Sequence, residues 1–228
     1  MFGIFIPVDG NYFLHCQGLL YSFKLLLDTP HEINIIDMGL TKKQKEVINS
    51  SFSLLNCKII DKPTTGNDKY SYKFKIDIIE MMFKSNYEYT IILDAKNHLK
   101  AKLSEIQEKV KLSKVLINSI DYIEKDWTHN TCLETMGVMN NEEILNSGQY
   151  QSNNVVFYNP QCKEIFESII MHGNNINCLY PKGSCKSFGG DSCHRQDQSV
   201  ISISLKLQGI KPTNWEYSTF HNTIIFDK

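Results

Sequence analysis

One short stretch constrains the fold more than any other: Tyr89-Thr-Ile-Ile-Leu-Asp94-Ala95-Lys96-Asn97, where an apolar run stops abruptly at a carboxylate. The run from Thr90 to Leu93 is rich in β-branched residues, does not alternate with polar residues and is too short for a core helix. It therefore predicts a strand that is buried on both faces. In open α/β sheets, ligands bind beyond the carboxyl ends of the strands. Asp94 is therefore expected to lie at a ligand site.

The first sixty residues alternate between predicted strands and predicted helices. Strands are expected at 3–8, 33–36 and 57–60, and helices at about 12–27 and 41–49. Asp9 or Asn11 is expected to cap the first helix, and Thr41 the second. A β-α-β-α-β order implies a parallel sheet and an α/β fold.

The rest of the chain continues this alternation with less regular spacing. The pattern predicts helices at 72–83, 99–111, 160–171 and about 190–207, strands at 114–118 and after Asn154, and irregular structure at 119–143. Lys75 falls in the first turn of the helix at 72–83, where a cation opposes the helix dipole. Two interpretations stay open for Lys75: it is the partner of an anion, or it is a solvated surface charge.

Composition limits the class of protein. The chain has 228 residues and a net charge of −1, which fits one α/β domain and gives no case for bulk nucleic-acid binding. Seven cysteines without a Cys-x-x-Cys pair predict free thiols in a reducing, cytoplasmic compartment. No apolar run approaches the roughly 20 residues of a membrane span, and the N-terminal residues do not resemble a signal peptide.

The strand followed by Asp94-Ala95-Lys96-Asn97 resembles the Asp-x-Asp motif of nucleotide-sugar glycosyltransferases with the GT-A fold, with Lys96 in place of the second acid. The form Asp-Ala-Lys-Asn looks most similar to GT-A-type transferases of large DNA viruses, including those of algae, and of some bacteria. The segments 7–12 (Pro-Val-Asp-Gly-Asn-Tyr) and 37–41 (Asp-Met-Gly-Leu-Thr) look like the stretches that hold the nucleoside in that fold.

The resemblance implies a single domain over residues 1–228, with a Rossmann-like, mixed but mostly parallel central sheet flanked by helices. Residues 1–98 would form the nucleotide-binding half and residues 99–228 the half that binds the acceptor and the donor sugar. The nucleotide-binding residues that it implies are Pro7, Val8, Asp9, Asn11, Tyr12, Asp37, Gly39, Leu40, Lys75, Asp94, Ala95 and Lys96.

The second half carries the residues that the resemblance places near the donor sugar and the reaction centre. Asn153 and Asn154 precede an apolar strand, and amides donate to and accept from hydroxyls without adding charge. They and His194 are implied to face the donor sugar. Asp197, in an Asp-Gln pair before an apolar helix, and Asp191 are the implied catalytic carboxylates, although capping the helix would by itself explain Asp197.

A nucleoside diphosphate leaves readily only when its developing charge is neutralised. The resemblance implies a divalent cation for this purpose, Mn²⁺ in preference to Mg²⁺, held by Asp94 and by the late histidine His221. A lone histidine is as often a surface or core residue. Lys96 leaves two outcomes open: it points away from the cation or touches phosphate, or it supplies positive charge itself.

The implied function is a glycosyltransferase of the hexosyltransferase class, which would move a hexosyl or deoxyhexosyl group from a UDP-sugar to a glycan or glycoprotein acceptor. It would work in the cytoplasm, or in the host cytoplasm if the source is viral. Spacing does not choose between inversion and retention, and the oligomeric state is not predicted.

Three other functions remain as alternatives. The first is a non-catalytic nucleotide-binding or glycan-binding module on the same fold, because the second acid of the motif is missing. The second is a nucleotidyltransferase, which the lack of a Gly-rich loop after the first strand disfavours. The third is a zinc-binding interaction protein that uses Cys178, Cys185, Cys193 and His194, whose spacings match no usual finger.

Overall fold

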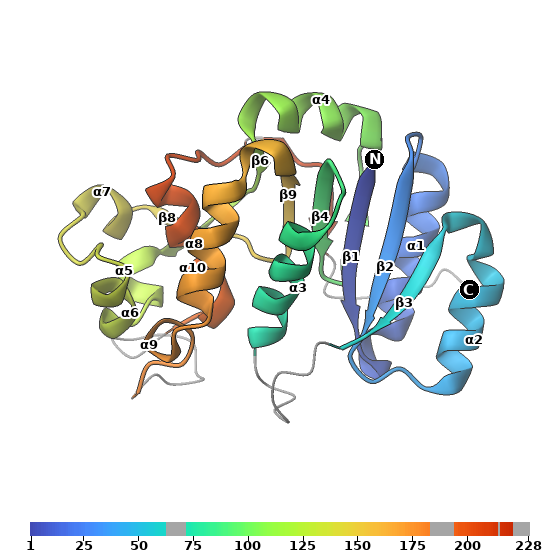
Figure 1. The fold of residues 1–228 in the computed structure, drawn as a ribbon, viewed down its shortest axis with the longest axis horizontal. Coiled ribbons are helices and arrows are strands. Elements are labelled where there is room, and N and C mark those ends of the chain that lie inside the picture. The colour runs from blue at the N-terminus through green and yellow to red at the C-terminus, as the bar shows by residue number, and fades with distance from the viewer. Residues whose placement is uncertain (63–71, 183–193, 214, 221–228) are drawn as a thin grey trace.

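The computed structural model describes residues 1–62, 72–182, 194–213 and 215–220. Its centre is a six-stranded sheet in the order β3-β2-β1-β4-β9-β6, with helices on both faces (Figure 1). The strands of this sheet are β1 Phe2–Val8, β2 His31–Asp37, β3 Cys57–Asp61, β4 Tyr89–Leu93, β6 Val115–Leu116 and β9 Asn154–Tyr158. The α-helices are α1 Phe13–Leu26, α2 Lys42–Ser51, α3 Lys73–Lys84, α4 Leu103–Ser113, α5 Glu124–Trp127, α6 Asn130–Thr135, α7 Glu142–Leu145, α8 Lys163–Gly173, α9 Ile176–Leu179 and α10 Gln196–Leu207.

The central sheet is mixed but mostly parallel, which confirms the predicted α/β fold class. β1 pairs in parallel with β2 and β4, and β2 pairs in parallel with β3. β9 then runs antiparallel to both β4 and β6. Because β6 and β9 come from the second half of the chain, both halves contribute to one sheet.

The apolar run of β4 is explained by two hydrophobic cores, one on each face of the sheet. Ile91 and Leu93 pack into the core under α1 and α4, whereas Ile92 packs into the core under α3, α8 and α10. All five residues of β4 are buried, as the non-alternating pattern predicts. The strand is therefore anchored on both faces, and this fixes the position of the residue that follows it, Asp94.

Two small two-stranded sheets accompany the central sheet. β5 Asn97–Leu99 pairs antiparallel with β10 Ser218–Phe220, and β7 Ser119–Ile123 pairs antiparallel with β8 Gly148–Tyr150. The helix predicted to begin at Leu99 therefore begins at Leu103 instead. The apolar spacing of that helix was interpreted correctly, but a ladder with a distant segment takes up residues 97–99.

The prediction of irregular structure over 119–143 is also wrong. This region contains β7, α5, α6 and the start of α7. The last three elements have four to six residues each, which is too short for a helical period to show in the sequence. Among the described residues, none of the helices is both long and apolar enough to cross a membrane.

Candidate active site

The carboxyl ends of β1, β2 and β4 lie at one edge of the sheet, and the turn after β1 is the first part of the site. The carboxylate of Asp9 accepts hydrogen bonds from the main-chain N–H groups of Asn11 at 2.8 Å and Tyr12 at 3.0 Å. It thereby caps the short 3₁₀ helix Gly10–Tyr12 that leads into α1. The cap fixes the turn, and the side chain of Tyr12 remains exposed at this edge.

The turn after β2 is held in a similar way. Asp37 Oδ1 accepts from the main-chain N–H groups of Gly39 at 2.9 Å and Leu40 at 2.6 Å, and its other oxygen pairs with Lys45. Burial raises the pKa of Asp37, but Lys45 and the two N–H groups outweigh it and hold the pKa below its usual range. Gly39 has a φ of +129°, which side chains rarely adopt, so the turn requires glycine.

A capping box at the start of α2 connects the two turns. Thr41 and Gln44 exchange hydrogen bonds between side chain and main chain, which confirms the predicted cap. The amide of Gln44 also donates to the carbonyl oxygen of Gly10 at 3.1 Å. The loop after β1 is therefore fixed by the helix that follows β2.

The turn after β4 is fixed by hydrogen bonds to main-chain carbonyl oxygens. The N–H of Asp94 donates to the carbonyl oxygen of Asn153 at 2.8 Å. The side-chain amide of Asn97 donates to the carbonyl oxygens of Asp94 at 3.0 Å and Asn153 at 2.9 Å. With its main chain held, Asp94 keeps a carboxylate that is 30% exposed.

Lys75 joins this turn to the second half of the chain. Its Nζ lies 3.0 Å from Asp94 Oδ1 and 3.5 Å from Asp197 Oδ2, and its side chain is only 7% exposed. Burial alone would lower the pKa of Lys75, but the two carboxylates outweigh it and hold the pKa above its usual value. The interpretation of Lys75 as a solvated charge is therefore wrong, and its partners within the protein are two carboxylates.

Asp197 lies in the first turn of α10, but it does not cap that helix. Arg195 occupies the capping position, and no side chain makes a capping hydrogen bond there. The Asp197 side chain is 5% exposed, and its Oδ2, which faces Lys75, has no hydrogen-bond partner among the described residues. A purely capping role does not explain this carboxylate, because it is directed at Lys75.

These turns enclose a cleft of about 810 Å³, within the range of small-molecule sites. The described residues that line it are Pro7, Asp9, Gly10, Asn11, Tyr12, Met38, Gly39, Lys62, Tyr72, Phe74, Lys75, Asp94, Ala95 and Lys96. Most of the predicted nucleotide-binding residues are among them. Val8, Asp37 and Leu40 do not line the cleft, because Val8 and Leu40 are buried and the carboxylate of Asp37 is used within its own turn.

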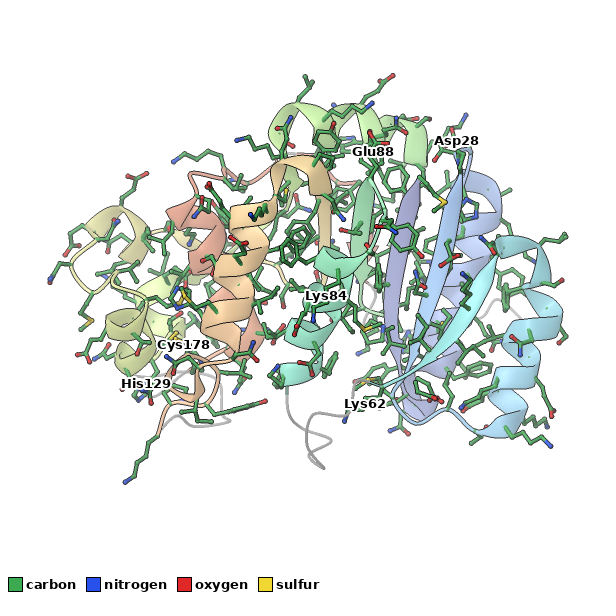
Figure 2. The ribbon with its side chains drawn as sticks, viewed as in Figure 1. Asp28, Lys62, Lys84, Glu88, His129 and Cys178 are labelled. Atoms are coloured by element: carbon green, nitrogen blue, oxygen red, sulfur yellow. The ribbon has the colours of Figure 1, made fainter. Side chains whose placement is uncertain are left out.

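Sequence reasoning missed several cleft residues. Lys62 directly follows β3 and lies at the same edge of the sheet (Figure 2), so the rule that identified Asp94 would also have found it. Tyr72 and Phe74 come from the start of α3, where the sequence analysis considered only the charge of Lys75. Met38 sits in the turn after β2 and carries no signal of its own.

The residues predicted to face the donor sugar do not line the cleft in the described structure. The Asn154 side chain is buried and donates to Ser218 Oγ at 2.7 Å. Asn153 contributes its carbonyl oxygen to the Asp94 turn. The side-chain oxygens of both asparagines are buried and have no hydrogen-bond partner among the described residues.

His194 is buried beside α9. Its Nδ1 accepts from the main-chain N–H of His129 at 3.3 Å, and its Nε2 then donates to the carbonyl oxygen of Cys178 at 2.6 Å. Burial lowers the pKa of His194 to about 4. Both ring nitrogens are therefore engaged by main-chain groups, which suits a structural histidine better than a zinc ligand.

The predicted residues Asp191 and His221 lie outside the described residues, as do Cys185 and Cys193 of the zinc alternative. Within the described ranges, no group of three histidine, cysteine or acidic side chains is placed to hold a metal ion. Asp94 is thus the one residue of the predicted metal pair that the structure places.

Together, the sheet order and the cleft at its carboxyl edge define the class: the chain has the GT-A fold of glycosyltransferases. Similar solved structures include the bifunctional glycosyltransferase WbbM, with 13% identity and a TM-score of 0.60 over 89% of this chain and 37% of that one. The galactosyltransferase LgtC, in complex with donor and acceptor sugar analogues, has 12% identity and a TM-score of 0.56 over 87% and 69%. Mouse xyloside xylosyltransferase 1 has 10% identity and a TM-score of 0.54 over 93% and 83%.

At these identities the likeness shows the fold alone. The chain spans little more than a third of the length of WbbM, as the 37% coverage states. No protein-family model and no curated protein sequence matches the chain.

The ion pairs of Lys75 predict a large effect on stability. Lys75→Met would leave Asp94 and Asp197 without their cation, and we expect it to lower the free energy of unfolding by about 3 kcal/mol. Lys84→Met is the matched control, since Lys84 lies on the same helix in an exposed pair with Glu80, and should cost no more than about 0.5 kcal/mol. Urea denaturation at pH 7 measures both. Equal, small losses would contradict a stabilising role for Lys75.

His194 predicts a pH-dependent loss of stability. Its folded pKa of about 4 lies below the unfolded value of 6.5, so the unfolded chain binds the proton first as the pH falls. Stability is therefore complete above pH 6.5 and declines toward pH 4, by about 3 kcal/mol in total. Urea denaturation between pH 7 and pH 4.5 should show a shallower decline in His194→Gln than in the unmodified protein. Parallel curves would show that His194 does not titrate in this way.

Proposed function

We propose that this protein is a glycosyltransferase that moves a hexosyl or deoxyhexosyl group from a UDP-sugar to a glycan or glycoprotein acceptor. The observation that carries the proposal is the meeting of Lys75, Asp94 and Asp197 beside a cleft at the carboxyl edge of a GT-A sheet. WbbM, LgtC and xyloside xylosyltransferase 1 are glycosyltransferases, and LgtC binds donor and acceptor sugar analogues. Their activities support the proposal by analogy of fold.

The cleft suits a nucleoside diphosphate. Tyr12 and Phe74 offer aromatic surface for a base, and the 3₁₀ turn that Asp9 caps also lines the cleft. Lys62 and Lys96 supply positive charge for phosphates. UDP is the nucleotide that the sequence resemblance favours, and the resemblance to transferases of large DNA viruses rests on the motif 94–97 alone.

In the proposed reaction, an acceptor hydroxyl oxygen forms a bond to the anomeric carbon, and the bond from that carbon to the diphosphate oxygen breaks. UDP leaves with the bonding electron pair, and the acceptor proton passes to a base. Asp197 is our candidate for the carboxylate that faces the anomeric carbon, with Asp191 as the second candidate. Lys75 acts as a positioning residue, because it holds both Asp94 and Asp197.

A divalent cation, Mn²⁺ before Mg²⁺, is part of the proposal. The partly exposed Asp94 carboxylate fits one ligand position, although it already pairs with Lys75. We propose Asp94 and His221, the pair that the sequence resemblance implies, as the protein ligands. Diphosphate oxygens would supply the others. Bound there, the cation would neutralise charge on the departing diphosphate.

One observation favours a second candidate function. The carboxylate of Asp94 already forms an ion pair with Lys75, and Lys96 stands where the motif has its second acid. A chain with these features fits a nucleotide-binding or glycan-binding module without catalysis. Turnover of a UDP-sugar separates the two candidates.

Cytoplasmic localisation stays a prediction from the sequence.

The test is a panel of UDP-sugars, with release of UDP measured in the presence of Mn²⁺ or of EDTA. We expect UDP release with Mn²⁺ and its loss in EDTA. Asp94→Asn and Asp197→Asn should each lower the rate by about 100-fold or more, because the first loses a cation ligand and the second a carboxylate at the reaction centre.

Asp28→Asn is the matched control. Asp28 lies at the opposite edge of the sheet from Lys62 (Figure 2), where it accepts hydrogen bonds from Ser104, and asparagine retains an acceptor oxygen. This variant should keep the rate of the unmodified protein. Binding of UDP without release from any UDP-sugar would favour the non-catalytic module, and full activity in EDTA would remove the cation from the mechanism.

A further inference from the structure

We propose that Lys96 is the protein's own cation for the diphosphate of the nucleotide, so that the nucleotide binds without a divalent metal ion. This inference rests on the proposed function and concerns the same cleft. The proposed function leaves open which charged group contacts the diphosphate first, and we assign that role to Lys96. The divalent cation would then act in the glycosyl-transfer step, and Lys96 would act in nucleotide binding.

The described lining of the cleft carries a small excess of positive charge. Among its described lining residues, the cations are Lys62, Lys75 and Lys96, and the anions are Asp9 and Asp94. Asp9 directs one carboxylate oxygen to two main-chain N–H groups. Asp94 lies 3.0 Å from Lys75. The formal charges of these described lining residues therefore sum to +1, which suits a diphosphate, and Asp197 lies beside them in its pair with Lys75.

The charge at residues 94–96 also differs from that of an Asp-x-Asp pair. An Asp-x-Asp pair carries two negative charges and repels a diphosphate until a cation arrives. Here Asp94 and Lys96 sum to zero, and so do Lys75 and Asp197 beside them, so the group as a whole is neutral. The exchange of the second acid for lysine therefore makes the local charge that an incoming diphosphate meets more positive by two units.

Of the three lysines in the described lining, Lys96 is the best placed to contact a diphosphate. Lys75 is buried and lies between two carboxylates, so it offers little to a ligand. Lys62 follows β3, which stands three strands from β4, or roughly 14 Å across the sheet. Lys96 lies in the turn after β4, two residues from Asp94. By position, it is the lysine nearest to where the diphosphate must sit for transfer.

The Lys96 side chain is directed toward Tyr12. Its Nζ lies 5.2 Å from the centre of the Tyr12 ring, a cation–π distance. Tyr12 belongs to the turn after β1, so the lysine reaches from the turn of β4 to the neighbouring turn. Both residues line the cleft. The ammonium group is thus held between the two turns that would contact the nucleotide.

The experiment is isothermal titration of UDP and of uridine, each in EDTA and in Mn²⁺. In EDTA, we expect the unmodified protein to bind UDP within about threefold of its affinity in Mn²⁺. Lys96→Met keeps most of the stem beside Tyr12 and removes the charge, so it should weaken UDP binding in EDTA by about tenfold and leave uridine unchanged. Lys100→Met is the control, because Lys100 lies on the same segment in an exposed pair with Glu216 and does not line the cleft.

Lys96→Asp provides a second, opposite test. It restores an Asp-x-Asp motif, so UDP binding should fall by more than tenfold in EDTA and recover on addition of Mn²⁺. Thermal unfolding of each variant confirms that it is folded, and the aspartate variant answers the question should the methionine variant fail to fold.

The outcomes separate the two proposals. If the unmodified protein binds UDP only with Mn²⁺, or if Lys96→Met binds UDP in EDTA as well as the unmodified protein does, the role of Lys96 is overturned and the proposed function stands. If UDP binds under neither condition, the nucleotide assignment fails, and both proposals fail with it. Binding in EDTA that depends on Lys96, without turnover of any UDP-sugar, supports the role of Lys96 and overturns the catalytic function.

Discussion

The bridge that Lys75 makes between Asp94 and Asp197 is the interaction on which the site depends. It connects α3, the turn after β4 and the start of α10, which are far apart in the sequence. A buried cation costs desolvation energy, and two carboxylates offset that cost only when both are held close. The rigid surroundings of each partner are therefore required by the bridge as well as by any ligand.

The turns around the bridge are held largely by hydrogen bonds between side chains and main-chain groups. Asp9 and Asp37 use their carboxylates to fix their own turns, Gln44 connects these two turns, and Asn97 fixes the turn of Asp94 to Asn153. These four polar side chains near the carboxyl edge thus each have a structural role within the protein. Such roles explain why residue type at a strand end does not by itself identify a ligand contact.

Local signals allowed much of the fold to be predicted from the sequence. The buried strand before Asp94, the cap at Thr41 and the parallel order of the first strands all depend on residues close together in the chain. Non-local contacts were not predictable in this way. The partners of Lys75, the ladder between residues 97–99 and 218–220, and the burial of His194 beside Cys178 depend on segments that only the folded chain brings together.

The small ladder of β5 and β10 has a consequence for folding. Phe220 pairs with Asn97, and the Tyr217 hydroxyl donates to the carbonyl oxygen of Asn154, so the turn that carries Asp94 is braced by a segment made more than a hundred residues later. Closing such a long loop costs chain entropy and slows the step that requires it. On a ribosome, β1, β2 and β3 would emerge and could pair first, and the turn after β4 would gain this support only once residues 217–220 have been made.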